Sequence, residues 1–140
     1  MYMMEKGQLN DTLGQGEAAE RKLHTTFLAS AFRTLHFGLT DSHARGMAIQ
    51  VNYLLDKGAF VSHGDGTFAV DFKKIKQAVI DLDREFLTIE ATGDYARARE
   101  MMGKYVVIRP DVQKALDRMK AVPNDIRPGF VTAEALLKAQ

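Results

Sequence analysis

The chain has 140 residues, of which 46% are hydrophobic and 26% are charged, a balance typical of a globular domain that can bury a core. Nineteen Lys and Arg against eighteen Asp and Glu give a formal net charge of +1, far from the concentrated positive field that binds nucleic-acid backbones. No cysteine is present, which excludes disulfides, Cys-ligated metal sites and thiol nucleophiles.

Neither a repeat nor a linker divides the chain. The three prolines all lie in the last quarter, so we expect one helical domain over residues 1–140, with residues 123–140 as a loosely packed tail. No apolar run approaches the roughly 20 residues that cross a bilayer, and residues 1–10 lack a signal-peptide pattern. We therefore expect a soluble, cytoplasmic protein with neither membrane nor nucleic acid as a partner.

Two helices are predicted in the first half of the chain. The first covers residues 17–37 and ends at Gly38. Its apolar stripe consists of Leu23, Phe27, Leu28, Ala31, Phe32 and Leu35. Because this stripe is wide, we expect the helix to be central and buried on more than one side. Thr40 or Asp41 can cap a second helix, which ends near Gly58.

A β-hairpin is predicted in the middle of the chain. Asp65 and Gly66 form a turn signal, and apolar or β-branched residues flank it at 60–61 and 67–70. Since a two-stranded hairpin is only marginally stable alone, it must pack on helices.

Three more helices follow the hairpin. Asp71 can cap a long helix whose apolar positions recur in steps of three and four as far as Ile89. Asp94 can cap a further helix that ends near Tyr105, and Pro110 suits the first turn of a last one. The fold class predicted is mainly α, a bundle of about five helices with one small β-hairpin.

The histidines do not form a recognisable metal motif. They are His24, His36, His43 and His63. No pair has the spacing of His-Glu-x-x-His, in which two ligands share one helix face, and no serine lies in a Gly-x-Ser-x-Gly turn. From the residues alone we predict no catalytic residue and no metal ligand.

One local cluster of residues is suited to binding an anion. His43 and Arg45 fall in the first turns of the second predicted helix, where free N–H groups and the helix dipole favour an oxyanion or a peptide carboxylate. The alternative is that Asp41 or Ser42 caps the helix while His43 and Arg45 are solvated. Gly46 lowers helix propensity, so it suggests close approach by a backbone or a ligand.

Several segments in one collinear order resemble a known family. They are TFLASAFR at 26–33, FG at 37–38, SHARGMA at 42–48, NYLLDKGAF at 52–60 and TGDY at 92–95. Together they resemble the C-terminal part of the dipeptidyl peptidase III family of zinc metallopeptidases, especially its shorter bacterial relatives, over about Leu23 to Val107.

The resemblance implies a helical region of a two-lobed enzyme that cleaves dipeptides from peptide N-termini. In that family, zinc is held by a His-Glu-x-x-Gly-His helix and by a glutamate of a Glu-Glu-Cys-Arg/Lys-Ala motif, and neither motif occurs in these 140 residues. We therefore expect a C-terminal fragment that binds no cofactor itself and is inactive alone. Its expected partners are an upstream zinc-binding region, in the same or another chain, and a peptide substrate.

The resemblance also implies two candidate substrate-binding residues. Larger enzymes of the family place a cleft-facing histidine with an arginine four positions later. Anchoring that pattern on His43 puts Met47 in the arginine position, whereas anchoring it on Arg45 puts Asp41 in the histidine position. Both His43 and Arg45 are carried as candidates, although two positions along a helix lie roughly 200° apart.

A second hypothesis is a stand-alone helical protein-binding module, because seven methionines suit an adaptable apolar face. An isolated enzyme piece should instead expose helix faces and self-associate into homo-oligomers. A helical DNA-binding domain is the least favoured, since the predicted helices mix both charge signs.

Overall fold

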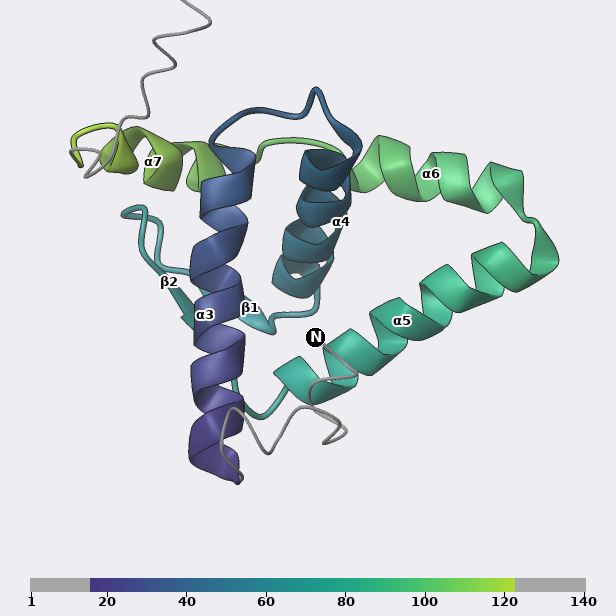
Figure 1. Ribbon diagram of the computed structural model, residues 1–140, viewed down its shortest axis with the longest axis horizontal. Helices are drawn as coiled ribbons and strands as arrows, with labels where there is room; N and C mark the ends of the chain where they lie inside the picture. Colours follow the sequence, from purple (N-terminus) through teal and green to yellow (C-terminus); the bar gives the residue numbers. More distant parts are fainter. Residues whose placement is uncertain (1–15, 123–140) are drawn as a thin grey trace, which may run out of the picture.

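The computed structural model describes residues 16–122, which form five α-helices and one β-hairpin (Figure 1). The elements in chain order are α3 (Glu17–Leu35), α4 (Ser42–Asp56), β1 (Phe60–Ser62), β2 (Phe68–Val70), α5 (Ile75–Thr92), α6 (Tyr95–Tyr105) and α7 (Pro110–Met119). This confirms the mainly-α bundle with a small hairpin. No helix in the described range is both long and apolar enough to cross a membrane.

The core lies where α3 and α4 run side by side in opposite directions. Leu35 of α3, Leu54 of α4, Phe60 of β1 and Ile75 of α5 are its largest fully buried apolar side chains. Burying each such side chain contributes about 1.5–3 kcal/mol. The core therefore joins the two central helices to the hairpin and to the start of α5.

The hairpin is antiparallel, with Phe60 paired to Val70 and Ser62 paired to Phe68. Its loop is longer than a two-residue turn, and Gly66 lies in it at φ 86°, a region that favours glycine. Two cations of α7 hold the loop: Lys114 Nζ donates to the Gly64 carbonyl at 2.6 Å, and Arg118 donates to the Asp65 carbonyl at 2.8 Å. The hairpin is thus fixed to α7 as well as to the core.

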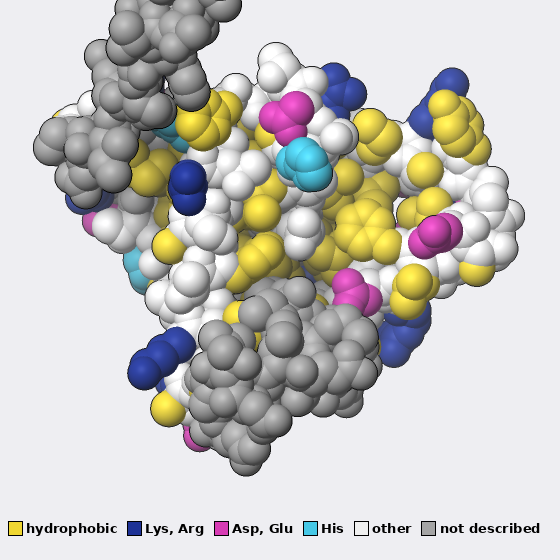
Figure 2. All heavy atoms as spheres, viewed as in Figure 1, with side chains coloured by type: hydrophobic (Ala, Val, Ile, Leu, Met, Phe, Trp, Pro, Cys, Tyr) yellow, Lys and Arg dark blue, Asp and Glu magenta, His cyan; other side chains and the backbone are white. Residues whose placement is uncertain are grey.

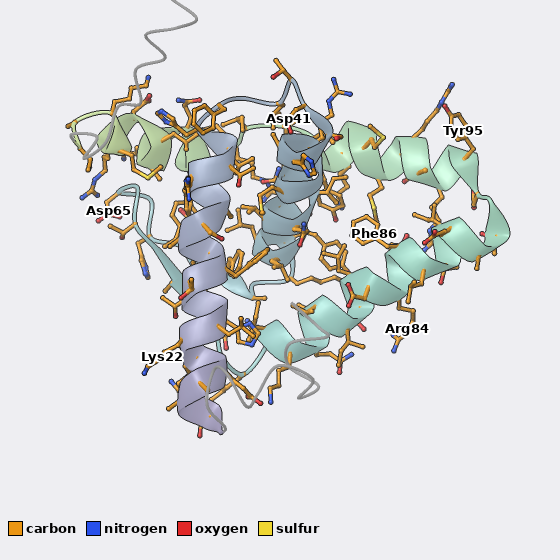
Figure 3. The ribbon with its side chains drawn as sticks, in the orientation of Figure 1. Lys22, Asp41, Asp65, Arg84, Phe86 and Tyr95 are labelled. Atoms are coloured by element: carbon orange, nitrogen blue, oxygen red, sulfur yellow. The ribbon has the colours of Figure 1, made fainter. Side chains whose placement is uncertain are left out.

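Helices α5 and α6 form a V that projects from the rest of the molecule, with its open side facing α4 (Figure 1). Gly93, at φ 63°, ends α5, and Asp94 caps α6 by accepting a hydrogen bond from the Arg97 backbone N–H at 3.0 Å. All residues from 90 to 97 are exposed. Phe86 points from α5 toward the inside of the V, whereas Tyr95 points away from it (Figure 3).

The structure corrects two sequence-based expectations. One long face of α3 is exposed from Lys22 to Arg33, so this helix is buried along one side and not on several. Asp71 does not cap α5, because its carboxylate and its carbonyl organise a preceding turn, and the helix begins at Ile75 with Lys74 as its N-cap. The predicted tail, residues 123–140, lies outside the described residues.

Candidate functional site

The start of α4 carries the two residues predicted to bind substrate. Asp41 caps this helix, since its Oδ1 accepts the Ala44 backbone N–H at 3.0 Å (Figure 3). That hydrogen bond holds the pKa of the Asp41 carboxyl below its usual range. A carboxylate of the chain itself therefore already occupies the N-terminal position that an external anion would take, which agrees with the capping alternative.

His43 and Arg45 are both exposed and are not brought together. Arg45 Nε donates to the Leu39 carbonyl in the α3–α4 loop at 3.0 Å, so its guanidinium is oriented by the backbone. Gly46 has no heavy atom within 4 Å of the position that a Cβ would take, so close approach by another part of the described chain does not account for it. The substrate-binding role of His43 and Arg45 stays a prediction.

The donor set does not fit zinc. Within residues 16–122, no group of three or more His, Asp or Glu side chains is placed to hold a metal ion. His24 is buried in α3, where desolvation lowers its pKa, while His36 and His63 are exposed near the end of α3 and in the hairpin loop. Since zinc needs about three converging ligands, the described side chains do not form such a centre.

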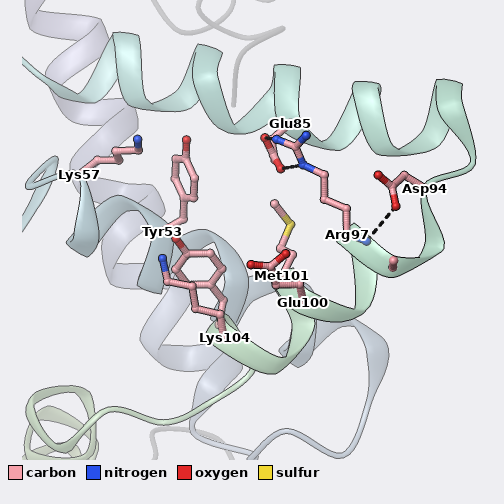
Figure 4. Close-up of a pocket in the computed structure, with 10 residues that line it drawn as sticks. Tyr53, Lys57, Glu85, Asp94, Arg97, Glu100, Met101 and Lys104 are labelled. Carbon is pink, nitrogen blue, oxygen red and sulfur yellow. Dashed lines mark hydrogen bonds and ion pairs between the residues drawn. The ribbon is translucent and has the colours of Figure 1, made fainter.

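A pocket of about 600 Å³ lies between α4, α5 and α6, and we call it the α4–α6 pocket (Figure 4). Hydrophobic side chains are visible in the hollow between these helices (Figure 2). Its floor is Tyr53, Met101 and Tyr105, each less than a tenth exposed. The rings of Tyr53 and Tyr105 meet edge to face, with centroids 5.8 Å apart, and burial raises the pKa of the Tyr53 hydroxyl.

Two lysines flank this aromatic floor. Lys57 Nζ lies 5.3 Å from the centre of the Tyr53 ring, and Lys104 Nζ lies 4.6 Å from the centre of the Tyr105 ring. Lys104 also lies 3.4 Å from Asp56. The tyrosine end of the pocket is therefore both aromatic and cationic.

An ion pair crosses the V on the other side of the pocket. Arg97 of α6 donates through Nε and Nη2 to the two carboxylate oxygens of Glu85 on α5, at 2.5 and 2.6 Å (Figure 4). This bidentate geometry fixes the relative position of the two helices, and the pair raises the pKa of Arg97. It therefore helps to set the width of the pocket.

Sequence reasoning missed the α4–α6 pocket. Tyr53 and Lys57 share one helix face at a spacing of four, and Lys104 and Tyr105 are adjacent, but these patterns are common in helices. The pocket exists because Asn52 fixes the end of α6 against α4: its Nδ2 donates to the Tyr105 carbonyl at 2.7 Å and to the Val107 carbonyl at 2.9 Å. No spacing of residues in the sequence predicts this contact between α4 and the end of α6.

Two solved structures resemble the chain along nearly its whole length. Dipeptidyl-peptidase III from Corallococcus sp. strain EGB is 42% identical with a TM-score of 0.79, and the match covers 98% of this chain and 25% of that one. DPP III from Caldithrix abyssi is 34% identical, also with a TM-score of 0.79, over 96% of this chain and 26% of that one. The chain thus has the fold of part of a dipeptidyl peptidase III chain and spans about a quarter of these enzymes.

A curated relative carries a different name. Nudix hydrolase 3 from Arabidopsis thaliana is 42% identical over 138 residues, which are 97% of this chain but 17% of that protein. The activity in that name belongs to a protein of which the chain matches less than a fifth. No family model matches the chain.

Proposed function

We propose that the chain is the C-terminal helical part of a dipeptidyl-peptidase-III-like zinc hydrolase and contributes substrate-cleft surface. The observation that carries this proposal is the likeness to two solved dipeptidyl peptidase III structures, which combines a TM-score of 0.79 with 42% and 34% identity. Agreement in both backbone and sequence favours a shared role for this region over a coincidence of helix packing.

The metal centre belongs to another part of the protein in this proposal. A bound zinc ion in such a hydrolase polarises the scissile carbonyl and lowers the pKa of a water molecule. The histidines of this chain are dispersed over different elements and do not fit such a site. An upstream zinc-binding region, in the same or another chain, is the partner we propose, and the chain alone is inactive.

His43 and Arg45 are the residues we propose for peptide binding. The hydrogen bond from Arg45 Nε to the Leu39 carbonyl leaves its terminal nitrogens to donate to a substrate carbonyl or carboxylate. His43 lies two residues earlier, with an exposed side chain near the positive end of the helix dipole.

The second candidate function is a stand-alone helical protein-binding module. The observation that favours it is the exposure of Leu87, Tyr95 and Met102 on the projecting helices α5 and α6. Exposed apolar side chains on neighbouring elements are typical of surfaces that bind another protein.

Zinc content and release of dipeptide from an arginyl-arginyl reporter test the proposal. We expect neither stoichiometric zinc nor turnover from the 140-residue chain, and turnover when it is joined to an upstream region with both zinc motifs. In that longer protein, Arg45→Ala and His43→Ala should lower kcat/KM, while His63→Ala, in the exposed hairpin loop, should not. Stoichiometric zinc with turnover from the chain alone would overturn the proposal.

A further inference from the structure

We infer that the α4–α6 pocket binds a peptide segment that carries one carboxylate beside an apolar side chain. The carboxylate pairs with Lys57 and Lys104, and the apolar side chain packs on Tyr53, Met101 and Tyr105. This inference goes beyond the proposed function and does not depend on it, because the pocket lies between α4, α5 and α6 and includes neither His43 nor Arg45.

The floor of the pocket is preformed for an apolar group. Tyr53, Met101 and Tyr105 are 9%, 8% and 7% exposed, and each is part of the main hydrophobic cluster, so their positions are fixed by packing. Two tyrosine rings in edge-to-face contact present a rigid aromatic surface at little cost in side-chain entropy. The volume of about 600 Å³ lies in the ordinary range of ligand pockets.

The positive charge at the end of the pocket formed by Tyr53 and Tyr105 favours binding of an anion. Asp56 is the acidic partner of Lys104 at 3.4 Å, but Arg109 binds the same carboxylate at 2.5 Å. Lys57 lies over the Tyr53 ring, and no carboxylate of residues 16–122 is within 4 Å of its Nζ. Lys104 and Arg109 thus share the carboxylate of Asp56, and Lys57 adds a third positive charge beside them, so an incoming carboxylate would offset the excess positive charge.

Other acidic groups limit the ligand to one carboxylate. Asp94 and Glu100 also line the pocket, on its α6 side, and the Arg97 guanidinium that they influence is already paired with Glu85. A second carboxylate would therefore meet like charge there. The negative charge of Asp81 on α5 also raises the pKa of Tyr53, but the side chains of Gln77 and Arg84 donate hydrogen bonds to the Asp81 carboxylate. These groups orient the ligand with its acid toward α4.

The test is a titration of the isotope-labelled 140-residue chain with acetyl-Leu-Glu-Leu-amide, followed by amide chemical shifts in NMR spectra. We expect shifts at Tyr53, Met101 and Tyr105. Acetyl-Leu-Gln-Leu-amide should bind up to about fivefold more weakly, as expected for loss of exposed ion pairs. Acetyl-Glu-Glu-Glu-amide should also bind more weakly, because its additional acids approach Asp94 and Glu100.

Variants assign the effect to the pocket. Lys57→Gln, and separately Lys104→Gln, should remove the preference for Glu over Gln, while Lys73→Gln, an exposed lysine ahead of α5, should keep it. Equal affinity for the Glu and Gln peptides, tighter binding of the triacidic peptide, or shifts confined to residues outside the pocket would overturn the inference. Shifts that depend on protein concentration without peptide would assign the pocket to a second copy of the chain and also overturn it.

Discussion

Replacing Asn52 by alanine is expected to lower the free energy of unfolding by about 3 kcal/mol. The Asn52 side chain is 1% exposed and donates two hydrogen bonds, to the carbonyls of Tyr105 and Val107. A buried carbonyl that loses its donor costs about 1–3 kcal/mol. The Tyr105 carbonyl, in the interior, should lie in the upper half of that range, and the partly buried Val107 carbonyl near its lower end. Removing Asn52 Oδ1, which is buried without a hydrogen-bond partner among the described residues, offsets about 1 kcal/mol of this loss.

Urea denaturation followed by far-ultraviolet circular dichroism measures this loss. Gln50→Ala is the matched control, because Gln50 lies on the same helix and, among residues 16–122, its side chain bonds only within that helix, to the Gly46 carbonyl at 3.3 Å. The control should change stability by no more than about 0.5 kcal/mol. If Asn52→Ala destabilises the chain no more than the control does, the reasoning that Asn52 holds the end of α6 against α4 is refuted.

Four further substitutions test other features of the fold. Gly66→Ala should lower the melting temperature, at a cost of about 2 kcal/mol, because φ is 86° and the new Cβ would lie 2.9 Å from Cδ of Arg118; an unchanged melting temperature would contradict that geometry. Gly46→Ala, in open space inside α4, should raise stability in urea by up to about 1 kcal/mol; a loss would reveal a hidden contact. Phe60→Ala should cost about 3–5 kcal/mol in the same assay, since Phe60 is 1% exposed, and a loss below about 1 kcal/mol would contradict its place in the core. A backbone N–H of α4 lowers the pKa of Asp41, so the stability it contributes is present above the unfolded pKa of about 4 and is lost as pH falls through the lower folded value. Asp41→Ala should therefore weaken the acid dependence of the melting temperature, and an identical pH profile would exclude this linkage.

Much of the fold could be predicted because its signals are local. Asp41 and Asp94 cap α4 and α6, and Pro110 begins α7, as expected from residue types that satisfy the free groups at helix ends. The start of α5 could not be predicted, because an aspartate that organises a turn and one that caps a helix look alike in sequence. Asp71 does the former, and three residues separate it from Ile75.

The sequence predicts only part of the candidate site. The position of His43 and Arg45 in the first turns of α4 follows from local spacing, and the structure places both there. The α4–α6 pocket depends on Tyr53 and Tyr105, which are far apart in the chain and meet because the V of α5 and α6 returns to α4. Apolar periodicity predicts which face of a helix is buried, but not which distant helix will cover it.

Because the ion pair between Glu85 and Arg97 joins α5 to α6, the salt concentration should affect how rigidly these two helices are held together. Both side chains are reached by solvent, so added ions weaken their attraction, which extends over only about 8 Å at physiological ionic strength. The outer halves of α5 and α6, which Gly93 and Asp94 connect, should then move more freely relative to each other, while the apolar contacts near α4 are unaffected. Salt would therefore make the angle between the two helices less rigid and leave their contacts with α4 intact.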